Sequence, residues 1–305
     1  MPSPDATQTV APGSVFEPVP DLDRRFGGIK RLYGDAAAQK MQAAHVCVVG
    51  VGGVGSWAVE ALARSGVGCL TLIDLDMVAE SNTNRQIQAL GEEYGKAKVE
   101  VMAGRIAAIN PACRIHAIED FVSRENVAAL LSGDLDAVVD AIDEARVKAA
   151  IIAHCRTNGI PVVTAGAAGG QTDPTRIRRD DLAYTLQDPL LAKVRTLLRR
   201  EYGFASGASG KKGKPEKFGV PAIYSTEPLR YPEQVCTPDS SHAPQSGSGG
   251  LNCAGFGSSV CVTAPIGFAA AATALEQLIN PVRPEALSKG IPRKNKGFDK
   301  LSPNG

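Results

Sequence analysis

The stretch HVCVVGVGGVGS, residues 45–56, decides the fold. Its first half is apolar and mostly β-branched, which is typical of a strand covered on both faces of a parallel sheet. Gly50, Gly52 and Gly55 then form a G-x-G-x-x-G pattern, and residues 57–64 are amphipathic. Missing side chains permit a tight turn and let backbone N–H groups approach a phosphate at the N-terminus of a helix. The stretch therefore predicts a strand, a glycine loop and a helix that bind a nucleotide.

A carboxylate follows the next apolar run of the chain. Residues 69–73 are predicted as a second strand, and Asp74 follows Gly50 by 24 residues. A carboxylate at this distance can accept hydrogen bonds from ribose hydroxyls. A glycine-rich turn can also serve strand-to-helix packing alone, but the helix and the acid that follow favour a nucleotide site.

Strand-like and helix-like segments alternate along the rest of the body. The pattern predicts helices over residues 94–109 and 145–157, and strands over 113–118, 136–140 and 161–165. This is the order of a Rossmann-like, doubly wound α/β fold with a mostly parallel sheet, helices on both faces and a smaller C-terminal part. In such folds the carboxyl ends of the strands collect the ligand.

Composition limits the class of protein. The 305 residues are 44% hydrophobic and 21% charged, with a formal net charge of +1, which argues against wholesale electrostatic attraction to nucleic acid or membranes. The seven cysteines are scattered, without a C-x-x-C pair, and the chain has four histidines. The pattern therefore signals neither a disulfide framework nor a zinc site, and a reducing cytoplasm fits it best.

The two ends of the chain differ from its body. Residues 1–23 and 281–305 are rich in Pro and polar residues and are predicted to be disordered tails around an ordered domain over 24–280. Residues 254–279 are apolar enough by length to cross a bilayer, but small residues and a proline favour a buried helix or a homodimer contact over a membrane span.

The residues after Asp74 indicate a triphosphate. A nicotinamide site holds a diphosphate and needs few cations, whereas release of pyrophosphate from ATP builds up charge that Arg, Lys and a carboxylate-held Mg²⁺ can stabilise. Arg85, Lys98 and Asp143 supply these three groups. Taken singly, each of them would more commonly be an ordinary surface charge.

Four motifs carry a resemblance to a known family. The runs GVGGVGS at 50–56, DLDxVxxSNxNRQ at 74–86, GKAKVE around Lys98 and DAID at 140–143 resemble the adenylating domain of the ubiquitin-activating superfamily. The resemblance implies that the nucleotide lies against Gly53 and that Asp143 holds Mg²⁺. It also implies a homodimer, in which Arg25 of the partner subunit, or Arg31 as a second candidate, reaches the triphosphate. The candidate catalytic residues are Arg25, Arg85, Lys98 and Asp143, and the candidate nucleotide contacts are Gly50, Gly52, Gly53, Gly55, Asp74, Asp76, Asn82, Asn84, Arg85, Gln86, Lys98 and Asp140.

Within that superfamily, further runs narrow the resemblance. RRFGGIKRLYG, SNTNRQI, TAGAAGGQTDPTRI and NCAGFGSS are similar to the tRNA threonylcarbamoyladenosine dehydratase family. This implies ATP-dependent cyclisation of the threonylcarbamoyl group, in which the carboxylate is adenylated and the ureido group then displaces AMP. A cysteine desulfurase with its sulfur-acceptor protein is a further candidate partner, and a monovalent cation a further candidate ligand.

Two alternatives stay open. One is an adenylating enzyme for the C-terminus of a ubiquitin-like or sulfur-carrier protein, although such enzymes commonly carry two C-x-x-C zinc pairs that this chain lacks. The other is a nicotinamide-dependent oxidoreductase or a protein that only binds its nucleotide.

The docking of tRNA would need a local basic patch. The predicted candidates lie on a helix over residues 192–202 and on the loop 205–221, and they are Arg195, Arg199, Arg200, Lys211, Lys212, Lys214 and Lys217. Such a loop is more often a solvated connector than a binding element, and both interpretations stay open. The sequence leaves open the roles of Cys236 and of the second loop over 237–252.

Overall fold

The computed structural model describes residues 20–206, 216–231 and 256–280. The predicted tails, apart from residues 20–23, lie outside the described residues. So do Cys236, the loop 237–252 and most of the lysines of the loop 205–221.

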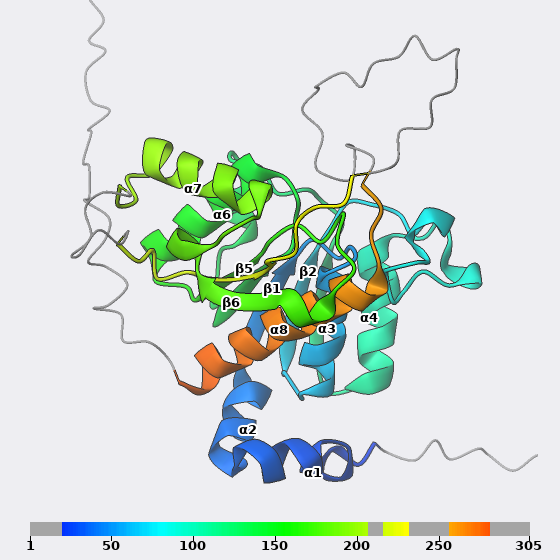
Figure 1. Cartoon of the computed structure of the whole chain (residues 1–305). Coiled ribbons are helices and arrows are strands. Elements are labelled where there is room, and N and C mark those ends of the chain that lie inside the picture. Colours follow the sequence, from blue (N-terminus) through cyan, green and yellow to red (C-terminus); the bar gives the residue numbers. More distant parts are fainter. Residues whose placement is uncertain (1–19, 207–215, 232–255, 281–305) are drawn as a thin grey trace, which may run out of the picture.

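A seven-stranded sheet forms the centre of the molecule, in the order β3-β2-β1-β4-β5-β7-β6 (Figure 1). All neighbours pair in parallel except the edge strand β6, which runs antiparallel to β7. The strand order reverses at β1, which lies between β2 and β4, and this is the point where doubly wound folds bind their ligands. The predicted fold class is therefore confirmed. The strands are β1 His45–Val49, β2 Cys69–Ile73, β3 Arg114–Ile118, β4 Ala137–Asp140, β5 Val162–Ala165, β6 Ile177–Asp181 and β7 Pro221–Ser225.

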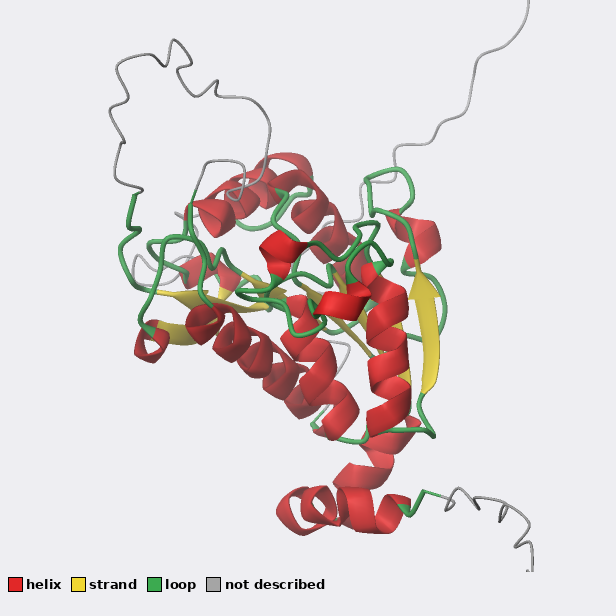
Figure 2. Ribbon diagram, turned by 90° about the vertical axis from the view of Figure 1, so that its right-hand side faces the viewer, coloured by secondary structure: helices red, strands yellow, loops and turns green. Residues whose placement is uncertain are grey.

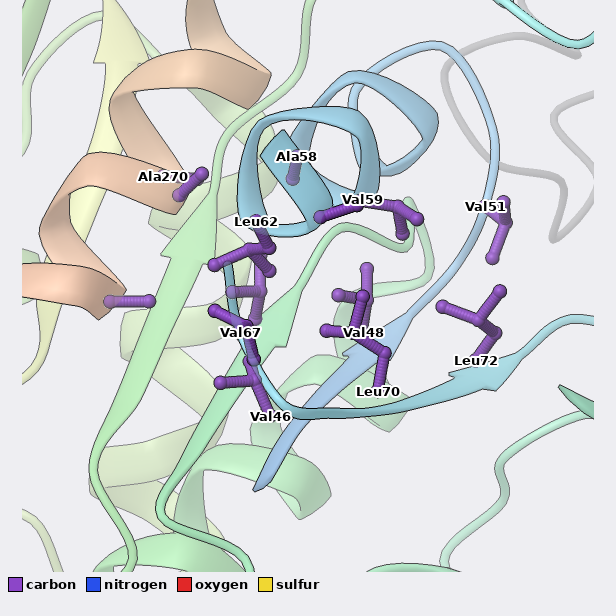
Figure 3. Packing of buried hydrophobic residues seen from close by; sticks show 14 of the residues in the cluster. Val46, Val48, Val51, Ala58, Val59, Leu62, Val67, Leu70, Leu72 and Ala270 are labelled. Carbon is purple, nitrogen blue, oxygen red and sulfur yellow. The ribbon is translucent and has the colours of Figure 1, made fainter. Parts of the chain in front are cut away.

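Three helices cover one face of the sheet, namely α3 (Gly55–Arg64), α4 (Lys98–Ile109) and α8 (Val260–Ile279). Between this layer and the sheet lies a core in which Val46 and Val48 of β1 meet Leu62 of α3 (Figure 3). Alternate residues of the same strand point to opposite faces, so Cys47 and Val49 belong to the second core. That core lies under α5 (Val127–Leu130), α6 (Ala145–Asn158) and α7 (Pro189–Glu201).

The helix α8 packs against α3 and the sheet. It is long and apolar enough to cross a membrane, but 61% of its most apolar 18-residue stretch is buried inside the protein. A Cβ on Gly267 would lie 2.4 Å from the carbonyl oxygen of Val54 and 2.9 Å from Cβ of Trp57. The small residues of α8 therefore permit a close helix–helix approach, as expected for a buried helix.

Two helices precede β1 and lie at one end of the molecule, α1 (Leu22–Tyr33) and α2 (Asp35–Ala43) (Figures 1 and 2). The Asp21 side chain caps α1, so the helix begins two residues before the predicted start of the domain at residue 24. Phe26 of α1 is buried and packs over Gly66.

Short 3₁₀ helices complete the fold. They are η1 (Glu80–Asn82), η2 (Gly91–Glu93), η3 (Pro174–Arg176) and η4 (Leu182–Tyr184). The first of them lies in the segment between β2 and α4, which carries most of the predicted phosphate contacts.

Candidate nucleotide-binding site

A cavity of about 520 Å³ opens at the carboxyl ends of β1, β2 and β4. Its volume falls within the range of small-molecule sites. Ten of the residues predicted to act in the site line it, namely Gly50, Gly52, Gly53, Asp74, Asp76, Asn82, Arg85, Gln86, Lys98 and Asp143.

The glycine loop forms one wall of the cavity, and its glycines act in different ways. Gly50 has φ +84°, in the left-handed region that favours glycine, and its N–H donates to the carbonyl of Ile73 at 2.9 Å. Gly53 lines the cavity, and a Cβ there would lie 3.2 Å from the Arg85 side chain. Gly55 is different, because its Cβ would lie 1.8 Å from the carbonyl oxygen of Gly50. Gly55 thus permits the turn to pack against α3 and is not among the lining residues.

Asp74 ties the end of β2 to the glycine loop. Its Oδ2 accepts from the N–H of Val51 at 2.6 Å, and its Oδ1 accepts from the N–H of Asp76 at 2.9 Å. These contacts hold the carboxylate at the edge of the cavity, where the sequence predicts a ribose contact.

Lys98 begins α4 and points into the cavity from the side of β2. Its side chain is almost fully buried, and Nζ lies 2.7 Å from Oδ2 of the largely exposed Asp76. The backbone repeats this link, because the N–H of Lys98 donates to the carbonyl of Asp76 at 3.0 Å. Asp76 therefore positions a buried ammonium group at the cavity.

Arg85 is held beside the glycine loop by its neighbours. One guanidinium nitrogen donates to the carbonyl of Ser81 at 2.8 Å and to Oδ1 of Asn84 at 2.9 Å. Asn84 itself donates to the carbonyl of Ser258 at 2.7 Å and is not among the lining residues. Its place in the structure is to position Arg85, and to join this segment to the one that precedes α8.

Asn82 and Gln86 line the cavity between Asp74 and Arg85, and both are buried. The Asn82 Oδ1 accepts from the N–H of Ala79, which closes the turn before η1. The Gln86 Oε1 accepts from Gln88, whose amide also donates to the carbonyl of Val51. The amides thus brace the segment against the glycine loop.

The two acids of the DAID motif separate in the structure. Asp140 is fully buried behind the cavity, where Oδ2 lies 3.0 Å from Nζ of the fully buried Lys148 and accepts from Thr164 at 2.7 Å. Asp140 is not among the residues that line the cavity, and its predicted contact with the nucleotide stays a prediction. Asp143 is exposed and lines the cavity. The next acid, Glu144, caps α6 by accepting from the N–H groups of Arg146 and Val147.

Arg25 lies away from this cavity within its own chain. Its guanidinium donates to the carbonyls of Ala108 and Ile109 at the C-terminus of α4, both at 2.9 Å, and it lines a separate pocket with Arg64 and Arg105. Unpaired carbonyls at a helix C-terminus attract a cation, which explains the contact. The single chain thus separates Arg25 from the other predicted catalytic residues.

Sequence reasoning missed a second wall of the cavity. Asp120 and Phe121 follow β3 and line it, as do residues 166–169 after β5. The N–H of Ala167 donates to Oδ2 of Asp188 at 2.9 Å, and a Cβ on Gly166 would lie 2.1 Å from the same oxygen. Burial raises the pKa of Asp188, against the effect of the backbone N–H groups that it accepts from. The position of Asp120 at the carboxyl end of a predicted strand was the available signal.

Comparison with known proteins identifies the family. The model of the ThiF family matches residues 24–291 of the chain. The tRNA threonylcarbamoyladenosine dehydratase of Escherichia coli K12 is 51% identical over 84% of this chain and 94% of its own length. The enzyme of the same name from Haemophilus influenzae is 45% identical over 87% of this chain and 97% of its own length.

A solved structure agrees with the sequence comparison. The crystal structure of the E. coli tRNA N6-threonylcarbamoyladenosine dehydratase TcdA in complex with ATP matches with a TM-score of 0.73 and 49% identity, over 84% of this chain and 94% of that one. TcdA in complex with AMP matches with a TM-score of 0.72. The chain belongs to the ThiF family, and within it to the tRNA threonylcarbamoyladenosine dehydratases.

Proposed function

We propose that this chain uses ATP to cyclise threonylcarbamoyladenosine in tRNA through an acyl-adenylate, within an adenylating domain over residues 24–280. The observation that carries the proposal is the cavity at the strand ends, which is lined by a glycine loop, Lys98, Arg85 and Asp143. The relative with 51% identity bears the name of this activity. The E. coli structures of that name that match this chain were solved with ATP and with AMP.

The reaction needs two displacements. The threonyl carboxylate attacks the α-phosphorus of ATP, so that an O–P bond forms and the bond to pyrophosphate breaks. The ureido group then attacks the activated carbonyl carbon, loses its proton and displaces AMP, which closes the ring. Over the two steps, the elements of water that the substrate loses end up in AMP and pyrophosphate.

The residues of the cavity suit the first displacement. Arg85 and Lys98 are fixed before ATP binds, by Asn84 and Asp76 respectively, and fixed cations stabilise the charge that develops on pyrophosphate. We assign the ribose to Asp74 and the phosphates to the N–H groups of the glycine loop and the N-terminus of α3.

Asp143 is our candidate ligand of Mg²⁺. Its carboxylate lines the cavity. Glu144 lines it too, and its carboxylate accepts from the N–H groups at the N-terminus of α6. One or two carboxylates plus phosphate oxygens are the usual surroundings of Mg²⁺ in nucleotide sites, so the residues present fit the ion. When bound there, Mg²⁺ would neutralise charge on the departing pyrophosphate.

Assembly and partners extend the proposal. A homodimer would bring Arg25 of the partner subunit to the triphosphate, and the apolar surface of α8 is a candidate contact because the ring of Phe268 is about half exposed. The cytoplasm, where tRNA is modified, is the proposed location. The monovalent cation and the sulfur-acceptor protein stay predictions.

The three arginines of the predicted basic patch already have partners within the protein. Arg195 donates to the hydroxyl of Thr185, Arg199 lies over the ring of Phe218, and Arg200 pairs with Glu201. These arginines therefore support α7 in part, and we place the greater share of tRNA contact on the loop lysines.

Mass analysis of tRNA nucleosides tests the proposal in cells. A strain that lacks the gene should accumulate the open threonylcarbamoyl form and lose the cyclic form, and the intact gene should restore it. An unchanged nucleoside profile would refute the proposal. It would favour the second candidate, activation of a carrier protein.

A further inference from the structure

Three side chains of types that commonly bind metals lie close together near the amino ends of β1, β2 and β3, opposite the cavity. His45 and Cys69 are the first residues of β1 and β2 and are direct neighbours in the strand register. His116 lies on β3, opposite Thr71. One donor atom from each of His45, Cys69 and His116 lies within 4.8 Å of the other two. The sequence could not signal this group, because its members are distant in the chain and meet only through the strand register.

The ring of His45 is already oriented by its neighbours. Its Nε2 lies 2.8 Å from Oγ1 of Thr71. A hydrogen-bond partner on one ring nitrogen is the usual support of a metal-binding histidine, because it fixes the ring and leaves the other nitrogen as a ligand. The rings of His45 and His116 are 5.6 Å apart between centroids, with their planes tilted by 39°.

The three residues differ in their exposure to solvent. Cys69 is buried, His45 is half-buried and His116 is exposed, so an ion can enter from the side of β3. A divalent cation would take the place of the thiol proton, because metals bind the thiolate.

The donor set selects the kind of metal. Two imidazole nitrogens and one thiolate suit Zn²⁺ and similar borderline ions, whereas Mg²⁺ and Ca²⁺ prefer oxygen ligands. Tetrahedral Zn²⁺ with bonds of about 2.0–2.3 Å needs donors somewhat closer than the limit of 4.8 Å, and small side-chain rotations supply the difference.

We propose that His45, Cys69 and His116 form a Zn²⁺ site, with a water molecule as the fourth ligand on the exposed side. The ion would tie β1, β2 and β3 together at their amino ends. It would act on stability and not on the reaction with ATP, because the nucleotide cavity lies at the carboxyl ends of the same strands.

Titration with Co²⁺ and Zn²⁺ tests the site on the full chain without a histidine tag. The chelator-treated protein should bind a single equivalent of Co²⁺ with a near-ultraviolet thiolate-to-cobalt band, and Zn²⁺ should displace it. Replacing a direct ligand, as in Cys69→Ser or His116→Ala, should weaken binding by at least about tenfold, since even second-shell changes cost about 10- to 100-fold. Cys69→Ser should also remove the thiolate band.

The controls are a cysteine and a histidine elsewhere in the fold. Cys261→Ser on α8 and His154→Ala on α6 should keep the affinity and the band. Zn²⁺ should raise the Tm of the unsubstituted chain but not that of His116→Ala, whose exposed side chain is not needed for folding. No thiolate band in the unsubstituted chain, or equal affinity in Cys69→Ser, would overturn the proposal. Pyrophosphate exchange is measured in the same His116→Ala variant. Normal exchange there shows that a result against the metal site leaves the proposed function intact.

Discussion

Replacement of Lys148 by methionine tests how the fold holds the acidic end of β4. Lys148 and Asp140 are both fully buried, with Nζ 3.0 Å from Oδ2, and Nζ also donates to the carbonyl of Ile142 at 3.0 Å. Lys148→Met would leave a buried carboxylate whose remaining side-chain partner is Thr164. Breaking a buried ion pair from one side costs about 3–5 kcal/mol, because one charge stays buried without its counter-charge.

Urea denaturation measures this loss as a difference in the free energy of unfolding. The double variant Lys148→Met with Asp140→Leu should recover most of it, because an apolar pair of similar volume often replaces a buried ion pair at little cost. Lys193→Met, at an exposed position on α7, is the matched control and should stay within about 0.5 kcal/mol of the unsubstituted chain. A loss below about 1 kcal/mol for Lys148→Met, or a double variant weaker than either single variant, would refute the reasoning.

The remaining predictions concern the cavity and the dimer. Gly55→Ala should lower both the Tm and the affinity for ATP, because its Cβ would lie 1.8 Å from the Gly50 carbonyl oxygen, whereas Gly104→Ala in α4 meets no atom within 4 Å and should leave both intact; equal effects would contradict the packing argument. Asp143→Ala should abolish pyrophosphate exchange while the Tm stays unchanged, and full exchange would remove Asp143 as the Mg²⁺ ligand. Mixing Arg25→Ala with Lys98→Ala subunits should restore part of the activity; no recovery despite measured subunit exchange would place Arg25 outside the partner's site.

The buried parallel strands could be predicted from the sequence because both of their faces lie in a core. Residues 46–49 are apolar throughout and 69–73 are apolar except for Thr71, and the structure has strands there. The edge strand β6 reads IRRDD and is largely exposed, so it carries no apolar signal of its own. The helix predicted from residue 94 begins at Lys98, because Ala97 forms a bridge with Met77 before the helix starts.

The cavity could be predicted where its residues lie within three positions of a strand end, as Asp74 and Asp143 do. The structure differs where a distant partner decides the position of a side chain. Asp140 lies beside Lys148, which is one helical segment later, and Arg25 lies on the C-terminus of α4. Such pairings depend on how the helices pack, so the spacing of residues along the chain does not predict them.

The central claim is that this site adenylates a carboxylate carried by tRNA. Exchange of labelled pyrophosphate into ATP measures that step directly, with tRNA that carries threonylcarbamoyladenosine and with the same tRNA that lacks the modification. We predict exchange with the modified tRNA alone. Exchange that instead requires a carrier protein ending in Gly-Gly, or no exchange with either tRNA, would contradict the account.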